Sequence, residues 1–208
     1  EDDLLRAAES ILRANGTLKF TPPGESERQV TVRLLAEPQV SGGAVKRFQL
    51  ALVAEDPRAY ASAQSTQDTT AVTASGGGTL TFPVTFPIGF GDPSSGGSAT
   101  ATNSGNRDTF PTIKVYGTIN GPTLRNLTTS KSLSFSGLQI TAPDYVEVDM
   151  LEETARLNGS ADNSVLGKLD VSTSEFWPLI PGANSVRLTG TDPDASAKAT
   201  LTWRHAYA

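Results

Sequence analysis

Short runs of alternating hydrophobic and polar residues constrain the fold more than any other feature of this chain. From residue 98 onward these runs are only a few residues long and are separated by turn signals. In one run Ile113, Val115 and Ile119 share a parity, and in residues 197–203 the apolar side chains again occupy every second position. A period of two residues is typical of strands with one buried face. About eight such strands without a convincing helix predict an antiparallel β-sandwich over residues 98–208.

A change of parity inside one of these runs predicts an irregularity. Leu133 and Phe135 share one parity, whereas Leu138 and Ile140 share the other. Because a single extra residue moves the following side chains to the opposite face, we predict a β-bulge at Gly137.

The stretch WPLIPGANSVRL, residues 177–188, predicts a rigid corner that leads into a strand. Pro181 presets φ at the second position of a type II turn, and Gly182 accepts the positive φ of the third position. Asn184 has the parity of the apolar residues that follow it. A buried amide is costly unless it is hydrogen-bonded, so we expect Asn184 to latch onto the backbone of the corner. Trp177 is expected to fill the core beside it.

Residues 1–61 predict a small α+β piece. Residues 1–16 carry an apolar stripe with helical period. Two strand patterns follow, QVTVRLL at 29–35 and KRFQLALVA at 46–54. We expect one helix packed on a small antiparallel sheet that is closed by EDPRAY at residues 55–60.

Residues 62–97 have the Ser/Thr/Gly/Pro-rich composition of a linker. Within them, residues 79–90 place apolar side chains on one parity and two prolines on the other. Proline cannot donate a ladder hydrogen bond, so an extended arm is favoured over an ordinary strand. Such an arm would lay its apolar stripe on a surface of this chain or of a neighbouring one. The residues of this possible interface arm are Phe82, Val84, Phe86 and Ile88.

Composition excludes several classes of function. The chain has 17 Lys and Arg against 22 Asp and Glu, a net charge of −5, which argues against a nucleic-acid partner. It has no cysteine and only one histidine, His205, so thiolate metal sites and chemistry based on several imidazoles are excluded. No apolar run is long enough for membrane insertion. The sequence has three pairs of carboxylates, and they lie in predicted caps and turns: Asp2 and Asp3, Glu152 and Glu153, and Asp192 and Asp194. We therefore predict no catalytic residue, metal site or cofactor.

Three stretches in order resemble the distal tail protein family of siphophages: EDPRAY at 55–60, NSGNRDTFPTIKVYG at 103–117 and WPLIPGANSVRL at 177–188. The second stretch is similar to the start of the family's C-terminal domain, and the third is similar to its late strand corner. The residues that match this structural signature are Asn103, Gly105, Pro111, Trp177, Pro181, Gly182 and Asn184.

The resemblance implies a mainly β protein with two domains. An N-terminal ring domain would form a homo-hexamer continuous with the tail tube, and a galectin-like jelly roll would project from it. The implied function is a structural, non-enzymatic hub at the distal end of the phage tail in the virion, with tail-tube and tail-tip proteins as partners. The region before the sandwich is shorter than in the family, so the chain is either trimmed at its N-terminus or a divergent member.

A carbohydrate-binding module that contacts a host-surface glycan is the alternative. In that case Phe176 and Trp177 would stack on a sugar, because aromatic rings offer a flat apolar face with a polar edge. Exposed aromatic rings in a groove would favour this alternative, whereas burial of Trp177 and Trp203 would favour the hub. A glycoside hydrolase accessory domain is a third and weaker hypothesis, since the sequence places no opposed carboxylate pair.

Overall fold

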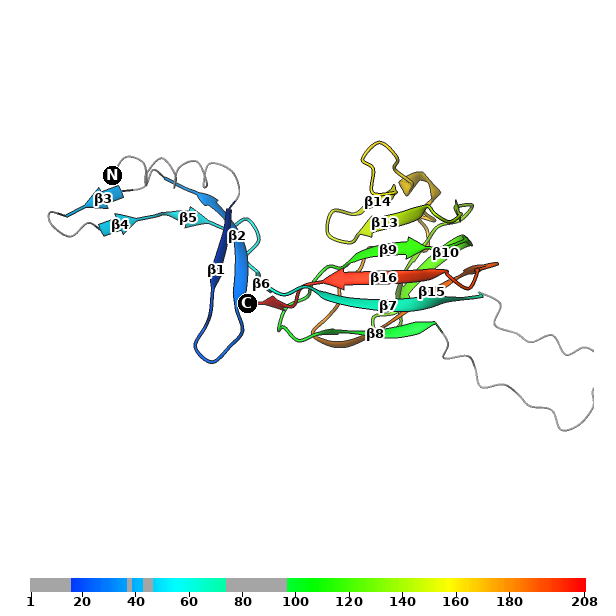
Figure 1. Ribbon diagram of the computed structural model, residues 1–208, viewed down its shortest axis with the longest axis horizontal. Coiled ribbons are helices and arrows are strands. Elements are labelled where there is room, and N and C mark those ends of the chain that lie inside the picture. Colours follow the sequence, from blue (N-terminus) through cyan, green and yellow to red (C-terminus); the bar gives the residue numbers. More distant parts are fainter. Residues whose placement is uncertain (1–15, 37–38, 43–46, 74–96) are drawn as a thin grey trace, which may run out of the picture. The chain divides into compact units, whose positions relative to one another are not determined.

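The computed structural model describes residues 16–36, 39–42, 47–73 and 97–208 (Figure 1). They form two compact units. The N-terminal unit contains Glu1–Ala63 together with His205–Ala208, and the sandwich unit contains Gln64–Arg204. The chain therefore passes between the units twice, once after Ala63 and once after Arg204. The sequence predicted only the first of these passages.

The N-terminal unit is built on an antiparallel sheet with the strand order β1-β2-β6-β17, and β5 pairs with β2. β3 and β4 form a separate antiparallel pair. The strands are β1 (Gly16–Phe20), β2 (Arg28–Leu34), β3 (Gln39–Ser41), β4 (Arg47–Gln49), β5 (Leu52–Val53), β6 (Ala59–Ala61) and β17 (Ala206–Tyr207).

Two expectations for this unit can be compared with the structure. In β2, Val32 is buried while Thr31 and Arg33 are exposed, which confirms the predicted alternation. The predicted single strand over 46–54 is instead divided into β4 and β5. The predicted helix over 1–16 lies outside the described residues except for Gly16, which begins β1.

The sandwich unit confirms the predicted fold class, an antiparallel β-sandwich. Its strands form one hydrogen-bonded sheet in the order β11-β10-β15-β7-β16-β9-β13-β14, with β12 paired to β10 and β8 paired to β15. On the two sides of β7 this sheet provides the two layers, one with β8, β10, β11, β12 and β15 and the other with β9, β13, β14 and β16. The elements are β7 (Ser65–Thr73), β8 (Ser98–Asn103), β9 (Thr112–Tyr116), β10 (Ile119–Asn126), β11 (Lys131–Ser134), β12 (Gln139–Ile140), β13 (Tyr145–Asp149), β14 (Thr154–Leu157), the short 3-10 helix η1 (Leu166–Lys168), β15 (Gly182–Thr191) and β16 (Lys198–Trp203).

The core of the sandwich lies between these two layers. Alternate residues of β9, β13 and β16 are buried, as the sequence predicted. This alternation leaves polar side chains such as Lys114 and Thr200 on the outer face. The largest fully buried side chains are Trp177, Phe135, Ile113, Ile119, Leu124, Leu133, Ile140, Met150, Leu179, Leu188, Leu201 and Val115.

Part of the predicted linker over 62–97 is wrong, because Ser65–Thr73 forms β7. β7 pairs antiparallel with β16 and parallel with β15, so it joins the two layers (Figure 1). A strand paired on both edges satisfies its backbone groups without a long apolar run. The buried Thr69 also donates its hydroxyl to the carbonyl of Gly97. The predicted arm at 79–90, with Phe82, Val84, Phe86 and Ile88, lies outside the described residues.

The parity change at Gly137 corresponds to a break between β11 and β12, both of which pair with β10. Gly137 has φ +67°. Thr123 pairs with Ser134 and Ile119 pairs with Ile140. The chain therefore advances four residues along β10 but six residues between β11 and β12, so the irregularity is larger than the single extra residue of a simple bulge. A second irregularity lies in β10 itself, where Gly121 has φ +55° and the register against β15 shifts. No helix in the described part of the chain has the length and hydropathy needed to span a bilayer.

Candidate functional site

The late strand corner, residues 177–184, is the centre of the sequence signature and lies inside the sandwich. The side chains of Trp177 and Leu179 are fully buried. The backbone of Leu179 exchanges two hydrogen bonds with Thr109, at 2.7 and 3.0 Å. Gly182 has φ +95° directly after Pro181, which agrees with the predicted type II turn. The corner is therefore attached to the middle of the second signature stretch.

Asn184 makes the predicted latch. Its amide nitrogen donates to the carbonyls of Ile180 at 2.8 Å and Gly182 at 3.1 Å. Its amide oxygen accepts from the backbone N–H of Ile180 at 3.1 Å. The side chain is fully buried, so these bonds replace the hydration that its amide loses on folding.

Two more buried asparagines bind the same segment from other strands. Asn103 of β8 donates to the carbonyls of Leu179 at 3.2 Å and Arg107 at 2.7 Å, and accepts from the N–H of Gly105 at 3.1 Å. Asn126 of β10 donates to the carbonyl of Pro178 and to the amide oxygen of Asn184, each at 3.4 Å. Asn103, Asn126 and Asn184 thus form a polar cluster, which we call the asparagine cluster.

The structure therefore brings most of the predicted signature residues together. Asn103 and Asn184 bind the corner directly, and Gly105 supplies a backbone donor to Asn103. Pro111 is also buried, and its carbonyl accepts the N–H of Met150. Asn126 was missed by sequence reasoning, although it has the same parity as the buried Leu124 in β10. Every one of these contacts is internal, so the cluster supports the fold.

The proposed glycan contact at Trp177 is contradicted by its burial. None of its side chain is exposed, and Phe176 packs partly buried against the core. Trp203 is also buried, and its indole N–H donates to the carbonyl of Thr102 at 3.2 Å. Both tryptophans therefore form part of the sandwich interior, as expected for the scaffold hypothesis.

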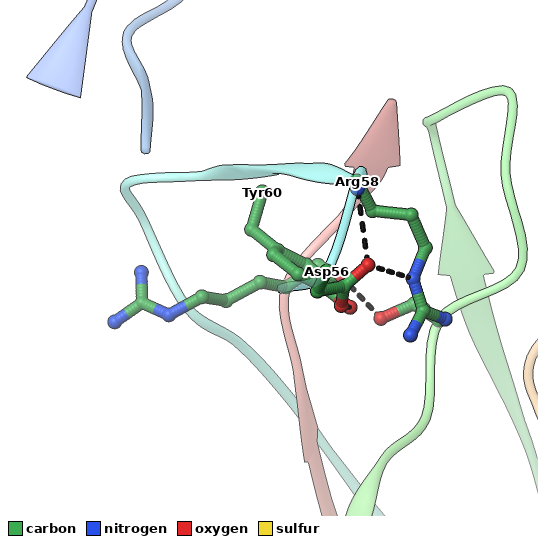
Figure 2. Close-up of polar contacts among 5 residues, drawn as sticks. Asp56, Arg58 and Tyr60 are labelled. Atoms are coloured by element: carbon green, nitrogen blue, oxygen red, sulfur yellow. Dashed lines mark hydrogen bonds and ion pairs between the residues drawn. The ribbon is translucent and has the colours of Figure 1, made fainter. Parts of the chain in front are cut away.

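The EDPRAY stretch of the N-terminal unit forms a compact hydrogen-bonded clamp (Figure 2). One carboxylate oxygen of Asp56 accepts from the backbone N–H of Arg58 at 3.0 Å and from its Nε at 2.8 Å. The other oxygen accepts from the hydroxyl of Tyr60 at 2.6 Å. We call these three residues the Asp56 clamp. They fix the turn that leads into β6.

The ionisation of the clamp follows from these contacts. Partial burial tends to raise the pKa of Asp56, but the hydrogen bonds from Arg58 and Tyr60 outweigh it, so the pKa lies below its ordinary value. Burial and the neighbouring Asp56 carboxylate both raise the pKa of Tyr60, which keeps the phenol protonated as a donor. Asp56 is therefore a structural anion.

The outer face of β9, β13, β16 and β7 carries a second group of polar contacts. The rings of Tyr116 and Tyr145 lie 5.3 Å apart with a tilt of 36°. The Nζ of Lys114 lies 3.1 Å from the carboxylate of Glu147 and 5.2 Å from the ring centre of Tyr145. In the neighbouring strands, Asp68 accepts from Lys198 at 2.9 Å and from Thr200 at 2.6 Å. We call this surface the tyrosine face; its residues are Tyr116, Tyr145, Lys114, Glu147, Asp68, Lys198 and Thr200. It is partly exposed, and among these residues the two lysines are matched by two carboxylates.

The two carboxylate pairs in the described residues lie in turns. Glu152 and Glu153 are exposed in the turn between β13 and β14. Hydrogen bonds from Ser196 and from the backbone of Thr118 lower the pKa of Asp194 to about 2, so its carboxylate is engaged by the turn around it. The first pair, at residues 2 and 3, lies outside the described residues. Within the described ranges, no group of three or more His, Cys, Asp or Glu side chains is placed to hold a metal ion.

Comparisons with known proteins agree with the sequence signature. The model of the family described as "Siphovirus-type tail component, C-terminal domain" matches residues 104–207, half of the chain. The crystal structure of Dit (gp 19.1) of phage SPP1, described as a paradigm of hub adsorption apparatus in phages that infect Gram-positive bacteria, has a similar fold. The TM-score is 0.65 at 16% sequence identity, and the match covers 100% of this chain and 73% of that one. No curated protein sequence matches the chain. The chain thus belongs to the family of siphovirus-type tail components, and the signature residues of the strand corner lie inside the matched domain.

Proposed function

We propose that this tail component is a non-enzymatic structural hub at the distal end of the phage tail, where it joins the tail tube to the tip. One observation carries the proposal: the family match covers a sandwich in which the signature residues Asn103, Trp177 and Asn184 are fully buried, and both asparagines bind the domain's own backbone. Such a domain presents a rigid scaffold. The similarity of the fold to a hub protein over the whole chain supports the same role.

We further propose that copies of this chain assemble as a homo-hexamer through the N-terminal unit. β1 lies at one end of its sheet in the described part of the chain. It carries two large apolar side chains that are well exposed, Leu18 at 45% and Phe20 at 40%. An exposed edge strand with apolar side chains is a surface on which another chain can pair. A second copy of the same surface is the simplest partner for a ring.

The solution mass of the protein tests this proposal. Native mass spectrometry is expected to show six copies, and Leu18→Asp with Phe20→Asp is expected to give monomers. Thr17→Asp is the matched control, because Thr17 is an exposed residue on the same strand that contributes no large apolar surface. Gold-labelled antibody against the sandwich should label one end of the tail. A monomeric wild type, or label spread along the tube, would contradict the hub.

A glycan-binding role is the second candidate, and the tyrosine face favours it. Tyr116 and Tyr145 offer adjacent aromatic rings beside carboxylate, ammonium and hydroxyl groups, which is the chemistry that binds the apolar faces and hydroxyls of a neutral sugar. Binding on a glycan array that falls at least tenfold in Tyr116→Ala and Tyr145→Ala, but not in Val171→Ala, would support it. Unchanged binding in the tyrosine variants would exclude this face.

A further inference from the structure

Residues 205–208 follow the sandwich in the sequence but belong to the N-terminal unit. β17 pairs antiparallel with β6, with Ala206 opposite Tyr60 and Tyr207 opposite Ala59. The backbone N–H of Ala61 also donates to the carbonyl of His205 at 2.9 Å. These bonds occupy the edge of β6 that β2 does not use.

The side chains of this segment contribute to the buried hydrophobic residues in the described part of the N-terminal unit. Among the described residues of the N-terminal unit, the buried hydrophobic side chains are Val32, Ala59, Ala61 and Ala206. Ala206 is fully buried, although its strand has only two residues. One of these four buried side chains therefore comes from the segment beyond the sandwich.

Tyr207 extends the contact from β6 to β2. The guanidinium of Arg28 lies 3.9 Å from the centre of the Tyr207 ring, which is a close cation–π contact. Arg28 itself lies opposite Ala61 in the ladder between β2 and β6 and pairs with Glu25. The segment is therefore held by β6 through its backbone and by β2 through its aromatic ring.

The Asp56 clamp prepares β6 for this partner. Its three residues fix the turn immediately before and within β6, so the strand is aligned while its outer edge remains available. A preordered edge lowers the entropy cost of adding a short strand. The clamp residues lie in the EDPRAY stretch, which gives that part of the sequence signature a physical role.

We propose that the edge of β6 is the docking site for residues 205–208. We further propose that the N-terminal unit closes, in the sense that its sheet becomes stably formed, only after this segment has docked. Because the segment follows the sandwich in the sequence, the N-terminal unit cannot close during synthesis until the sandwich has been made. The strand that carries the proposed assembly surface belongs to the same sheet. Assembly through that surface is then restricted to chains that have completed the sandwich, a consequence that rests on the proposed function.

Hydrogen exchange measured by mass spectrometry tests docking directly. A chain that stops after Arg204, and a full-length Ala206→Glu variant, are expected to lose at least tenfold protection in peptides that cover β2 and β6. Peptides that cover β10 and β15 should keep their protection. Tryptophan fluorescence should not change, because both tryptophans lie in the sandwich unit. Ala208→Glu is the control, since Ala208 is exposed.

Several outcomes would overturn the proposal. Full protection of β6 in the shortened chain would show that docking is not needed for closure. Equal loss of protection in β10 and β15 would show that residues 205–208 stabilise the whole chain. Loss of protection with an unchanged oligomer mass would refute the restriction on assembly. A monomeric wild type would contradict the proposed hub, yet the exchange result would still report on docking.

Discussion

The two units of this chain use the same kind of secondary structure but differ in how much they bury. The sandwich unit has a continuous core that includes Trp177, Phe135 and many branched aliphatic side chains. The described part of the N-terminal unit buries one valine and three alanines. Hydrophobic burial is the main favourable term in folding, so the sandwich is expected to be stable by itself. The described part of the N-terminal unit buries far fewer hydrophobic side chains. Under the proposed function, the sandwich is the scaffold and the N-terminal unit carries the assembly surface.

Trp177→Ala is expected to have the largest effect on stability, and that effect should be confined to the sandwich unit. Removal of a fully buried indole should destabilise the sandwich by about 3–5 kcal/mol, because the surrounding side chains cannot fill the cavity. Denaturant unfolding followed by the fluorescence of Trp203 measures the change. Hydrogen exchange in β2 should stay as in wild type. Val171→Ala is the control, since Val171 is 83% exposed and its change should lie within about 0.5 kcal/mol.

Gly117→Ala is expected to cost roughly 2–5 kcal/mol, the sum of left-handed backbone strain and overpacking. A Cβ at Gly117, where φ is +83°, would lie 2.6 Å from the backbone of Ala197. Gly24 in the N-terminal unit has a similar φ of +77° but open space around it. Gly24→Ala should therefore cost only the strain. Thermal unfolding of both variants compares them, and an equal loss would show that the two units are equally tightly packed.

Asn184→Ala is expected to destabilise the sandwich by about 1–3 kcal/mol, because two carbonyls and one N–H of the corner would lose their partner. Asn163→Ala is the matched control at an exposed asparagine, with an expected change within about 0.5 kcal/mol. Equilibrium unfolding in urea measures both changes. An effect of the control size at Asn184 would show that the asparagine cluster does not support the corner.

Lowering the pH should destabilise the two units through different carboxylates. We expect this to be the smallest of the four effects. Asp56 and Asp194 both have pKa values below the ordinary 3.8, so each contributes stability above that pH. For Asp194 this contribution is lost between about pH 4 and pH 2, and for Asp56 it is lost as the pH falls through its lowered pKa. Asp56→Asn should flatten the acid dependence of exchange in β6, and Asp194→Asn that in β16. No change in either variant would contradict the clamp and the turn.

Local rules predicted much of the sandwich from the sequence. The strand corner was predicted from Pro181 followed by Gly182, which is typical of a type II turn. The latch was predicted from the inward parity of Asn184. The alternation in β9, β13 and β16 was readable because each strand has one buried and one exposed face. These features depend on neighbours in sequence, so no knowledge of the whole fold was needed.

Features that depend on distant pairing were not predicted. β7 has the composition of a linker, and only its ladders with β15 and β16 show that it is a strand. The apolar parity of β16 gave no sign that the chain leaves the sandwich after Arg204 and pairs with β6. Asn126 became visible as a partner of the corner only when β10 and β15 were placed side by side.

The position of β7 has a mechanical consequence. The chain enters the sandwich at the start of β7 and leaves it at the end of β16, and these two ends are paired with each other at Ser65 and Trp203. β7 pairs with β16 along Ser65–Thr70 and with β15 at Ala71–Thr73, and β16 also pairs with β9. Tension transmitted through either passage therefore acts at the end of a strand in this ladder. If it acts along the strand, many of these bonds must yield together, whereas an end pulled sideways would release them one at a time. A sandwich that is loaded along these strands gains resistance to rupture from this arrangement.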